Sequence, residues 1–217
     1  MAAFDDRVIG YTPASTAKLL PFAMEQAAYE DAILNGNDDY SFDNNGGVVD
    51  SSPDGINEMI LFPLSPAPGN FGRLNIGVGN QGEPAVAEQI LNGVTPEQLE
   101  AEIGSTELVF ADVNSNPVTY EITGNPGITN GLIPELETKI GEVVSFLLYS
   151  TAVDVGSNTI YTIVGVRFGR VMEIKLTGNP ADRGIFLQPV VAADPGVHTG
   201  PTGISSGGQI GRLVLME

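Results

Sequence analysis

Carboxylates in an acidic stretch from residue 37 to residue 58 are the side chains best placed for chemistry in this sequence. Asp50, Asp54 and Glu58 recur every four residues across a glycine turn. Oxygen ligands grouped around a turn are typical of calcium loops, although this spacing is not the D-x-D-x-D-G of an EF-hand. Two interpretations stay open: solvated turn acids, which the pattern favours, or a metal site for calcium formed by these three residues.

A glycine-rich segment at residues 77–82 matches G-x-G-x-x-G and lies between a predicted strand and a predicted helix. Backbone amides at such a turn can face the pyrophosphate of a dinucleotide. However, the sequence shows no succession of βαβ units, and no strand ends in an acidic residue about 20 residues further on. The strong negative charge of the chain also disfavours a phosphate ligand. The segment is better interpreted as a turn.

Nucleophilic chemistry has little support. Ser15 and Lys18 match S-x-x-K, the acylatable serine motif of penicillin-recognising enzymes, but the S-D-N and K-T-G motifs that complete this chemistry are missing. The chain has no cysteine, which excludes disulfides and thiolate catalysis, and its one histidine excludes a metal site with two His ligands. That residue, His198, is predicted to be exposed in a loop rich in Gly, Pro and Thr.

The charge of the chain limits its partners. Among 217 residues, 27 are acidic and 9 are basic, giving a net charge of -18. Nucleic acids and anionic membrane surfaces would be repelled by this charge. No segment approaches the roughly 20 apolar residues of a membrane helix, and the N-terminus lacks the features of a signal peptide. We expect a soluble chain, whole or part of something larger, with no nucleic-acid partner and no direct membrane insertion.

The elements that must position these residues are mostly strands. The densest β-forming passage, residues 158–177, predicts two strands, with Gly165 and Gly169 marking a bulge or bend between them. Further strands are expected at residues 7–11, 58–64, 70–77, 107–111, 118–123, 143–149, 184–191 and 212–215. Four short helices are expected at residues 21–34, 83–91, 95–103 and 132–140.

These patterns predict an α+β, mainly β fold with a barrel- or sandwich-like core of mostly antiparallel strands. No linker rich in Pro, Gly and Ser separates two self-sufficient hydrophobic halves, so one domain over residues 1–217 is expected. Its first 36 residues, a strand and a helix, would pack on the β core.

Several passages together resemble the TadG-like proteins of the Tad (tight adherence, Flp-type) pilus-assembly group. The passages, which occur in the order found in that family, are residues 20–24, 52–56, 68–77, 90–94, 161–172 and 175–178. The run Pro-Gly-Asn-Phe-Gly within residues 68–77, followed by a strand, is the most specific of them. The resemblance extends over residues 20–215.

The resemblance implies a protein held by one N-terminal membrane helix, with a large extracytoplasmic part that takes part in pilus assembly or surface attachment. It implies no catalytic residues. This chain lacks the membrane helix, so we expect the exported portion, located in the periplasm or at the cell surface and partnered by other pilus-assembly or cell-envelope proteins. The expected function is a non-enzymatic structural or interaction module, and the alternative is a calcium-stabilised adhesion or ligand-binding domain.

Overall fold

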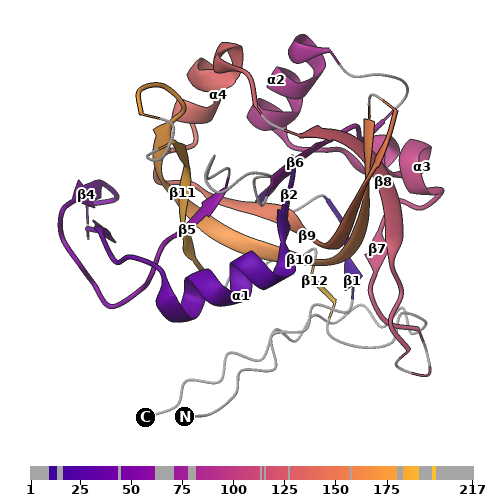
Figure 1. The fold of residues 1–217 in the computed structure, drawn as a ribbon, viewed down its shortest axis with the longest axis horizontal. Coiled ribbons are helices and arrows are strands. Elements are labelled where there is room, and N and C mark those ends of the chain that lie inside the picture. Colours follow the sequence, from indigo (N-terminus) through magenta and orange to yellow (C-terminus); the bar gives the residue numbers. More distant parts are fainter. Residues whose placement is uncertain are drawn as a thin grey trace.

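The chain folds around a mainly β core with four α-helices among its described residues, and its sheets are mostly antiparallel (Figure 1). The computed structural model describes residues 10–13, 17–43, 45–61, 71–77, 82–112, 114, 116–126, 128–156, 158–179, 183–190 and 197–198. The α+β, mainly β class and the four short helices predicted from the sequence are therefore confirmed. The strand predicted at residues 212–215 lies outside the described residues.

Five strands close into a barrel. They are β2 (Lys18–Glu25), β6 (Phe71–Leu74), β8 (Tyr120–Pro126), β9 (Val143–Val155) and β10 (Asn158–Lys175). β10 pairs with β8, β8 with β6, β6 with β2, and β2 with β9, which pairs again with β10. The β2–β9 pair is parallel and the other four pairs are antiparallel. Closure of the ring pairs each of these strands on both sides for at least part of its length.

The strand β10 is 18 residues long and continues beyond the barrel. Its residues 169–175 pair with β11 (Gly184–Pro189), which pairs in turn with β5 (Met59–Leu61). The predicted division of this passage into two strands is wrong, because successive partner strands hold the chain extended through its glycines. Gly165 lies at a shift in register with β9, a bulge that bends the strand without ending it.

Residues 21–25 belong to β2, although the sequence pattern predicts a helix over residues 21–34. The helix α1 (Gln26–Asn35) begins only after this strand. Three residues of the segment pair with β6 and three pair with β9, so long-range pairing outweighs the local helical pattern. Pro21 has no N–H to donate, and it lies where the register with β9 is interrupted after Leu19.

The other helices follow their local sequence signals. They are α2 (Glu83–Asn92), α3 (Pro96–Ile103) and α4 (Ile133–Glu137), the last preceded by a 3-10 turn, η1 (Asn130–Leu132). At the start of α3, Thr95 and Gln98 exchange two hydrogen bonds between side chain and backbone, at 3.0 and 3.2 Å. Gly104 ends the helix in the left-handed region. Within the described part of the chain, no helix has the length and apolar character needed to cross a membrane.

Two smaller sheets lie outside the barrel. In the first, β1 (Gly10–Tyr11) pairs with β7 (Leu108–Val109) on one side and with β12 (Val197–His198) on the other. The prediction that His198 lies in a loop is therefore wrong, because antiparallel pairing with β1 orders this short segment as a strand. In the second, β3 (Tyr40–Phe42) and β4 (Val48–Asp50) form a hairpin.

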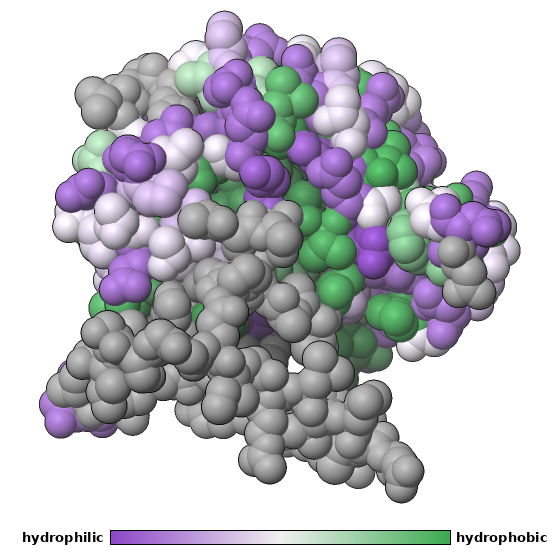
Figure 2. All heavy atoms as spheres, turned by 180° about the vertical axis from the view of Figure 1, so that it is seen from behind, coloured by the Kyte–Doolittle hydropathy of each residue, from purple (hydrophilic) through white to green (hydrophobic). Residues whose placement is uncertain are grey.

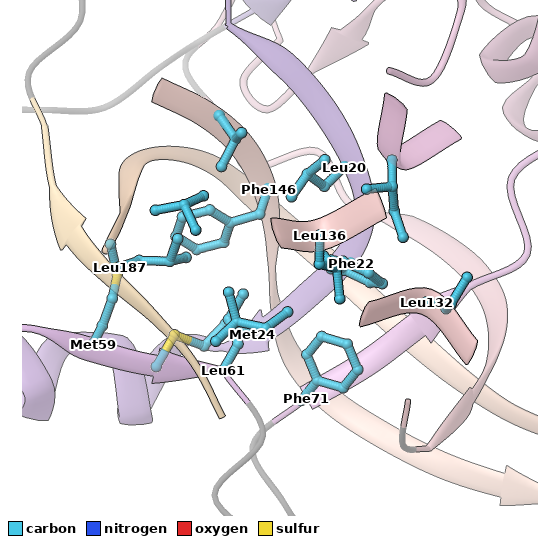
Figure 3. Close-up of a cluster of buried hydrophobic side chains, with 14 of the residues drawn as sticks. Leu20, Phe22, Met24, Met59, Leu61, Phe71, Leu132, Leu136, Phe146 and Leu187 are labelled. Carbon is cyan, nitrogen blue, oxygen red and sulfur yellow. The ribbon is translucent and has the colours of Figure 1, made fainter. Parts of the chain in front are cut away.

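Both faces of the barrel wall are buried, which creates two apolar clusters. All five barrel strands contribute to the inner cluster, where β2 supplies Leu19 and Ala23. The outer cluster receives Leu20, Phe22 and Met24 from the same strand. Figure 3 shows these three side chains meeting residues of β5, β9 and β11 and of the α4 region. The two-residue period of a strand thus sends alternate side chains of β2 into two different cores.

Inside the barrel, the ring of Tyr161 occupies space left by two glycines on neighbouring strands. A Cβ added at Gly72 of β6 would lie 2.6 Å from Cε1 of this ring, and one added at Gly124 of β8 would lie 3.0 Å from Cε2. On the other side, the ring packs edge-on against Tyr149 of β9, with 5.0 Å between centroids. Four of the five barrel strands therefore meet at one buried side chain.

We predict that Gly72→Ala destabilises the protein, because the added methyl group collides with the buried ring of Tyr161. The expected loss is about 1–3 kcal/mol in the free energy of unfolding, typical of an overpacked core. The control is Gly165→Ala, whose added Cβ would meet its nearest neighbour, Nη1 of Arg167, at 3.7 Å. Urea unfolding followed by circular dichroism compares the two variants, and equal stabilities would contradict the role given to Gly72.

Candidate functional site

The acidic segment from residue 37 to residue 58 leaves α1, forms the β3–β4 hairpin and returns to the sheet at β5. The hairpin projects from the body of the protein, and its surface in Figure 2 is mainly hydrophilic. Asp43 shapes its turn, where one carboxylate oxygen accepts hydrogen bonds from the backbone N–H groups of Asn45 and Gly47, at 2.9 and 2.7 Å. Turn chemistry of this kind is what the composition of the segment predicts.

A buried amide holds the returning end of this segment on the sheet. Gln188 of β11 places its Nε2 atom 3.0 Å from the carbonyl oxygen of Tyr40, 3.1 Å from Oε1 of Glu58 and 3.2 Å from Oδ1 of Asp54. The two hydrogens of the amide group are thus shared among three acceptors. The second carboxylate oxygen of Glu58 accepts a hydrogen bond of 2.7 Å from the backbone N–H of Asp39.

A further carboxylate, Asp38, organises the turn that contains Asp54. Its two oxygens accept hydrogen bonds from the backbone N–H groups of Asp54 and Gly55, at 2.9 and 2.7 Å. Neither Asp38 nor Gln188 is marked by spacing in the sequence, because their partners lie 16 or more residues away. The positions of the other acidic residues in the sequence do not predict which carboxylates lie close together in the fold.

The structure brings together two of the three residues predicted to bind calcium. The carboxylates of Asp54 and Glu58 converge on the same amide nitrogen of Gln188. Asp50 lies at the end of β4, opposite Tyr40 in the hairpin, and accepts a hydrogen bond from the hydroxyl group of Ser51. No set of three or more His, Asp or Glu side chains among the described residues is arranged to hold a metal ion. The calcium site stays a prediction.

The electrostatics of the segment are unusual because residues 37–58 include six acidic side chains and no lysine or arginine. The side chain of Glu58 is only 3% exposed. Burial raises its pKa, and the negative charge of Asp38 adds to this effect, while hydrogen bonds from the Asp39 backbone and the Gln188 side chain partly oppose it. N–H groups rather than cations therefore stabilise this carboxylate.

Aromatic side chains fix the hairpin to β10 and β11. The hydroxyl group of Tyr40 donates a hydrogen bond to Glu173, and its ring lies 5.9 Å from that of Phe186. The guanidinium of Arg170 lies 3.6 Å from the centroid of the Phe42 ring, within the range of a cation–π interaction. These contacts attach the base of the hairpin and leave Asp43 and its turn projecting.

The other motifs found in the sequence do not form a site in the described part of the chain. Lys18 is exposed at the start of β2, whereas Ser15 lies outside the described residues. In the glycine-rich segment, Gly77 has a φ of 116°, a conformation that favours glycine, and Gly82 precedes the first turn of α2. Residues 78–81 between them lie outside the described residues. The conformation of Gly77 agrees with the interpretation of this segment as a turn.

The substitution Glu58→Gln replaces a buried carboxyl group with an amide. We predict that it changes the pH dependence of the free energy of unfolding. In the wild type, the pKa of this group is higher in the folded than in the unfolded state, so the folded protein binds more protons between the two pKa values. Its contribution to stability therefore increases as pH falls through that window towards 4.5, the ordinary value. The wild type should gain stability relative to Glu58→Gln as the pH is lowered from neutral.

Urea unfolding at a series of pH values measures this difference in the free energy of unfolding. Glu100→Gln, at an exposed position of α3, serves as the control for the loss of one negative charge. A difference between wild type and Glu58→Gln that does not change with pH would show that burial leaves this carboxyl group unperturbed.

Comparisons with known proteins identify no relative. No family model matches the sequence, no curated protein matches it, and no solved structure matches the fold. The function of this chain must therefore be inferred from its own residues and from the surfaces that they form.

Proposed function

We propose that this chain is a non-enzymatic structural or interaction module, the extracytoplasmic part of a TadG-like pilus-assembly protein. The observation that carries the proposal is the contact between the two longest passages that resemble this group, residues 68–77 and 161–172. The first includes β6 and the second lies within β10. They meet inside the barrel, where Gly72 leaves room for the ring of Tyr161.

A third passage of the resemblance, residues 20–24, lies within β2, which pairs with β6 and β9 in the same ring. Three passages that lie far apart in the sequence, each similar to the pilus-assembly group, therefore come together in the barrel. This pattern supports a shared framework rather than a shared catalytic centre, because most of the described residues in these passages are buried packing residues. Function in such a framework depends on the surfaces that it presents.

The surface of the chain suits protein partners of opposite charge. The net charge of -18 attracts basic surfaces and repels nucleic acid. The acidic β3–β4 hairpin projects from the barrel, and the end of the β9–β10 hairpin exposes apolar side chains. We propose that other pilus-assembly or cell-envelope proteins bind such surfaces outside the cytoplasm, in the periplasm or at the cell surface.

Disruption of the gene in its own organism tests this function. We expect loss of surface filaments, counted by electron microscopy, and loss of attachment to glass or plastic. Expression of the wild-type gene or of the Gly165→Ala variant should restore both. Normal filaments and attachment in the disrupted strain would contradict the proposed role in pilus assembly.

A calcium-stabilised adhesion or ligand-binding domain is the second candidate. It is favoured by the approach of the Asp54 and Glu58 carboxylates to within 3.2 Å of one nitrogen atom of Gln188, since a cation could replace that amide as their shared partner. The exposed carboxylate of Asp50 would then complete the set of ligands.

Calcium binding predicts a rise in melting temperature when the ion replaces a chelator. At about 100 times its dissociation constant, the ion should add roughly 2.7 kcal/mol to the free energy of unfolding. The rise should disappear in Asp54→Ala and persist in Asp31→Ala, a control on the exposed face of α1. If the melting temperature of the wild type changes with neither calcium nor chelator, this candidate is ruled out.

A further inference from the structure

The outer half of β9 has an open edge. From residue 150 to residue 155, every side chain of this strand is exposed. The parallel pairing with β2 ends at Glu25 and Tyr149, and beyond that point β10 is the only described strand that pairs with β9. The backbone N–H and C=O groups on the outer side of this segment are therefore available to another strand.

Exposed apolar side chains make this edge suitable for the addition of a β-strand. Val153 and Val155 are 58% and 53% exposed, and both lie on the same face of the strand. Natural edges are commonly guarded by lysine, proline or a bulge. Here the only charged residue is Asp154, and its carboxylate accepts a hydrogen bond of 2.8 Å from Thr159 within the same hairpin. A register shift with β10 places a bulge at Ser150, at the start of the open segment, and residues 151–155 beyond it contain no lysine or proline.

The charge around the edge selects the occupant. Glu25 ends β2 beside the start of the open segment, and Asp154 lies within it. Neither β9 nor α1 contains a lysine or an arginine. Arg167 of β10 pairs with Phe146, at the other end of β9, where its guanidinium lies over the ring of Tyr29, 5.5 Å from the centroid.

A second copy of the chain fits this edge poorly. Antiparallel pairing of two such edges would bring together the acids of two chains that each carry a net charge of -18. Like charges facing one another across an interface cost binding energy, whereas a cationic partner gains it. The charge therefore favours a basic segment from a different protein.

We propose that residues 150–155 of β9 bind an extended, basic segment of a partner protein as an added β-strand. Apolar side chains of this segment would cover Val153 and Val155, and its lysine or arginine side chains would face Glu25 and Asp154. Main-chain hydrogen bonds would supply affinity, and alternate side chains would supply specificity. This inference rests on the proposed interaction function and names one surface and the partner chemistry that serve it.

A synthetic peptide with the repeat Lys-Val-Thr-Val provides the probe. Fluorescence anisotropy measures its affinity for the whole chain, and hydrogen exchange with mass spectrometry locates it. We expect binding, with slower exchange at residues 150–155. Val153→Lys should weaken binding at least about tenfold, because the new cation faces the basic peptide. Ile56→Lys, an equal charge change at an exposed residue of the acidic segment, should leave the affinity within about twofold.

A peptide methylated on alternate backbone nitrogens separates strand addition from charge attraction alone, because it keeps its charge and loses hydrogen-bond donors. It should bind at least about tenfold more weakly than the unmodified peptide. Equal binding of the two peptides, equal binding by Val153→Lys, or unchanged exchange at residues 150–155 would each overturn the proposal. So would protection of the same residues by self-association in the absence of peptide.

The peptide experiment and the gene disruption fail independently. Absence of peptide binding together with lost filaments would remove the added strand and leave the role in pilus assembly. Peptide binding together with normal filaments would support the added strand and contradict the role in pilus assembly.

Discussion

The ring of Tyr161 is the constraint on which the barrel depends. It fills the space between strands at a point where β6 and β8 each provide a glycine and β9 provides a second tyrosine ring. A side chain on either glycine would force neighbouring strands apart, so the close approach fixes how β6, β8, β9 and β10 lie around the ring. The parallel pairing of β2 with β9 then completes the closure.

Closure explains how a chain with short helices buries two apolar clusters. β2 and β9 have neighbours inside and outside the barrel, so their alternate side chains enter different clusters. Long-range pairing therefore holds both clusters together, and the acidic hairpin is joined to the barrel through a few side-chain contacts. The acidic segment is attached by Tyr40, Gln188 and Arg170 rather than by a core of its own.

Local signals predicted the elements whose stability is local. Thr95, Gln98 and Gly104 mark the start and end of α3 within a few residues, and the structure uses all three as the sequence indicates. Residues 21–25 have a pattern that suits a helix, but strands 45 or more residues away decide their conformation. For the same reason, Gln188 could not be predicted as the partner of Glu58, because 130 residues separate them. The sequence identified the acidic segment but not the amide that organises it.

Amide hydrogen exchange of the isolated chain, resolved by NMR, tests most directly whether a closed barrel carries separate exposed surfaces. Amides of β10 that pair with both β8 and β9, over residues 159–163, should exchange only through global unfolding. Amides on the outer side of β9 and in the turn of the acidic hairpin should exchange orders of magnitude faster. Equal protection of the barrel strand and the outer side of β9 in a monomer would show that this edge is already covered, and would contradict a rigid barrel with an open edge.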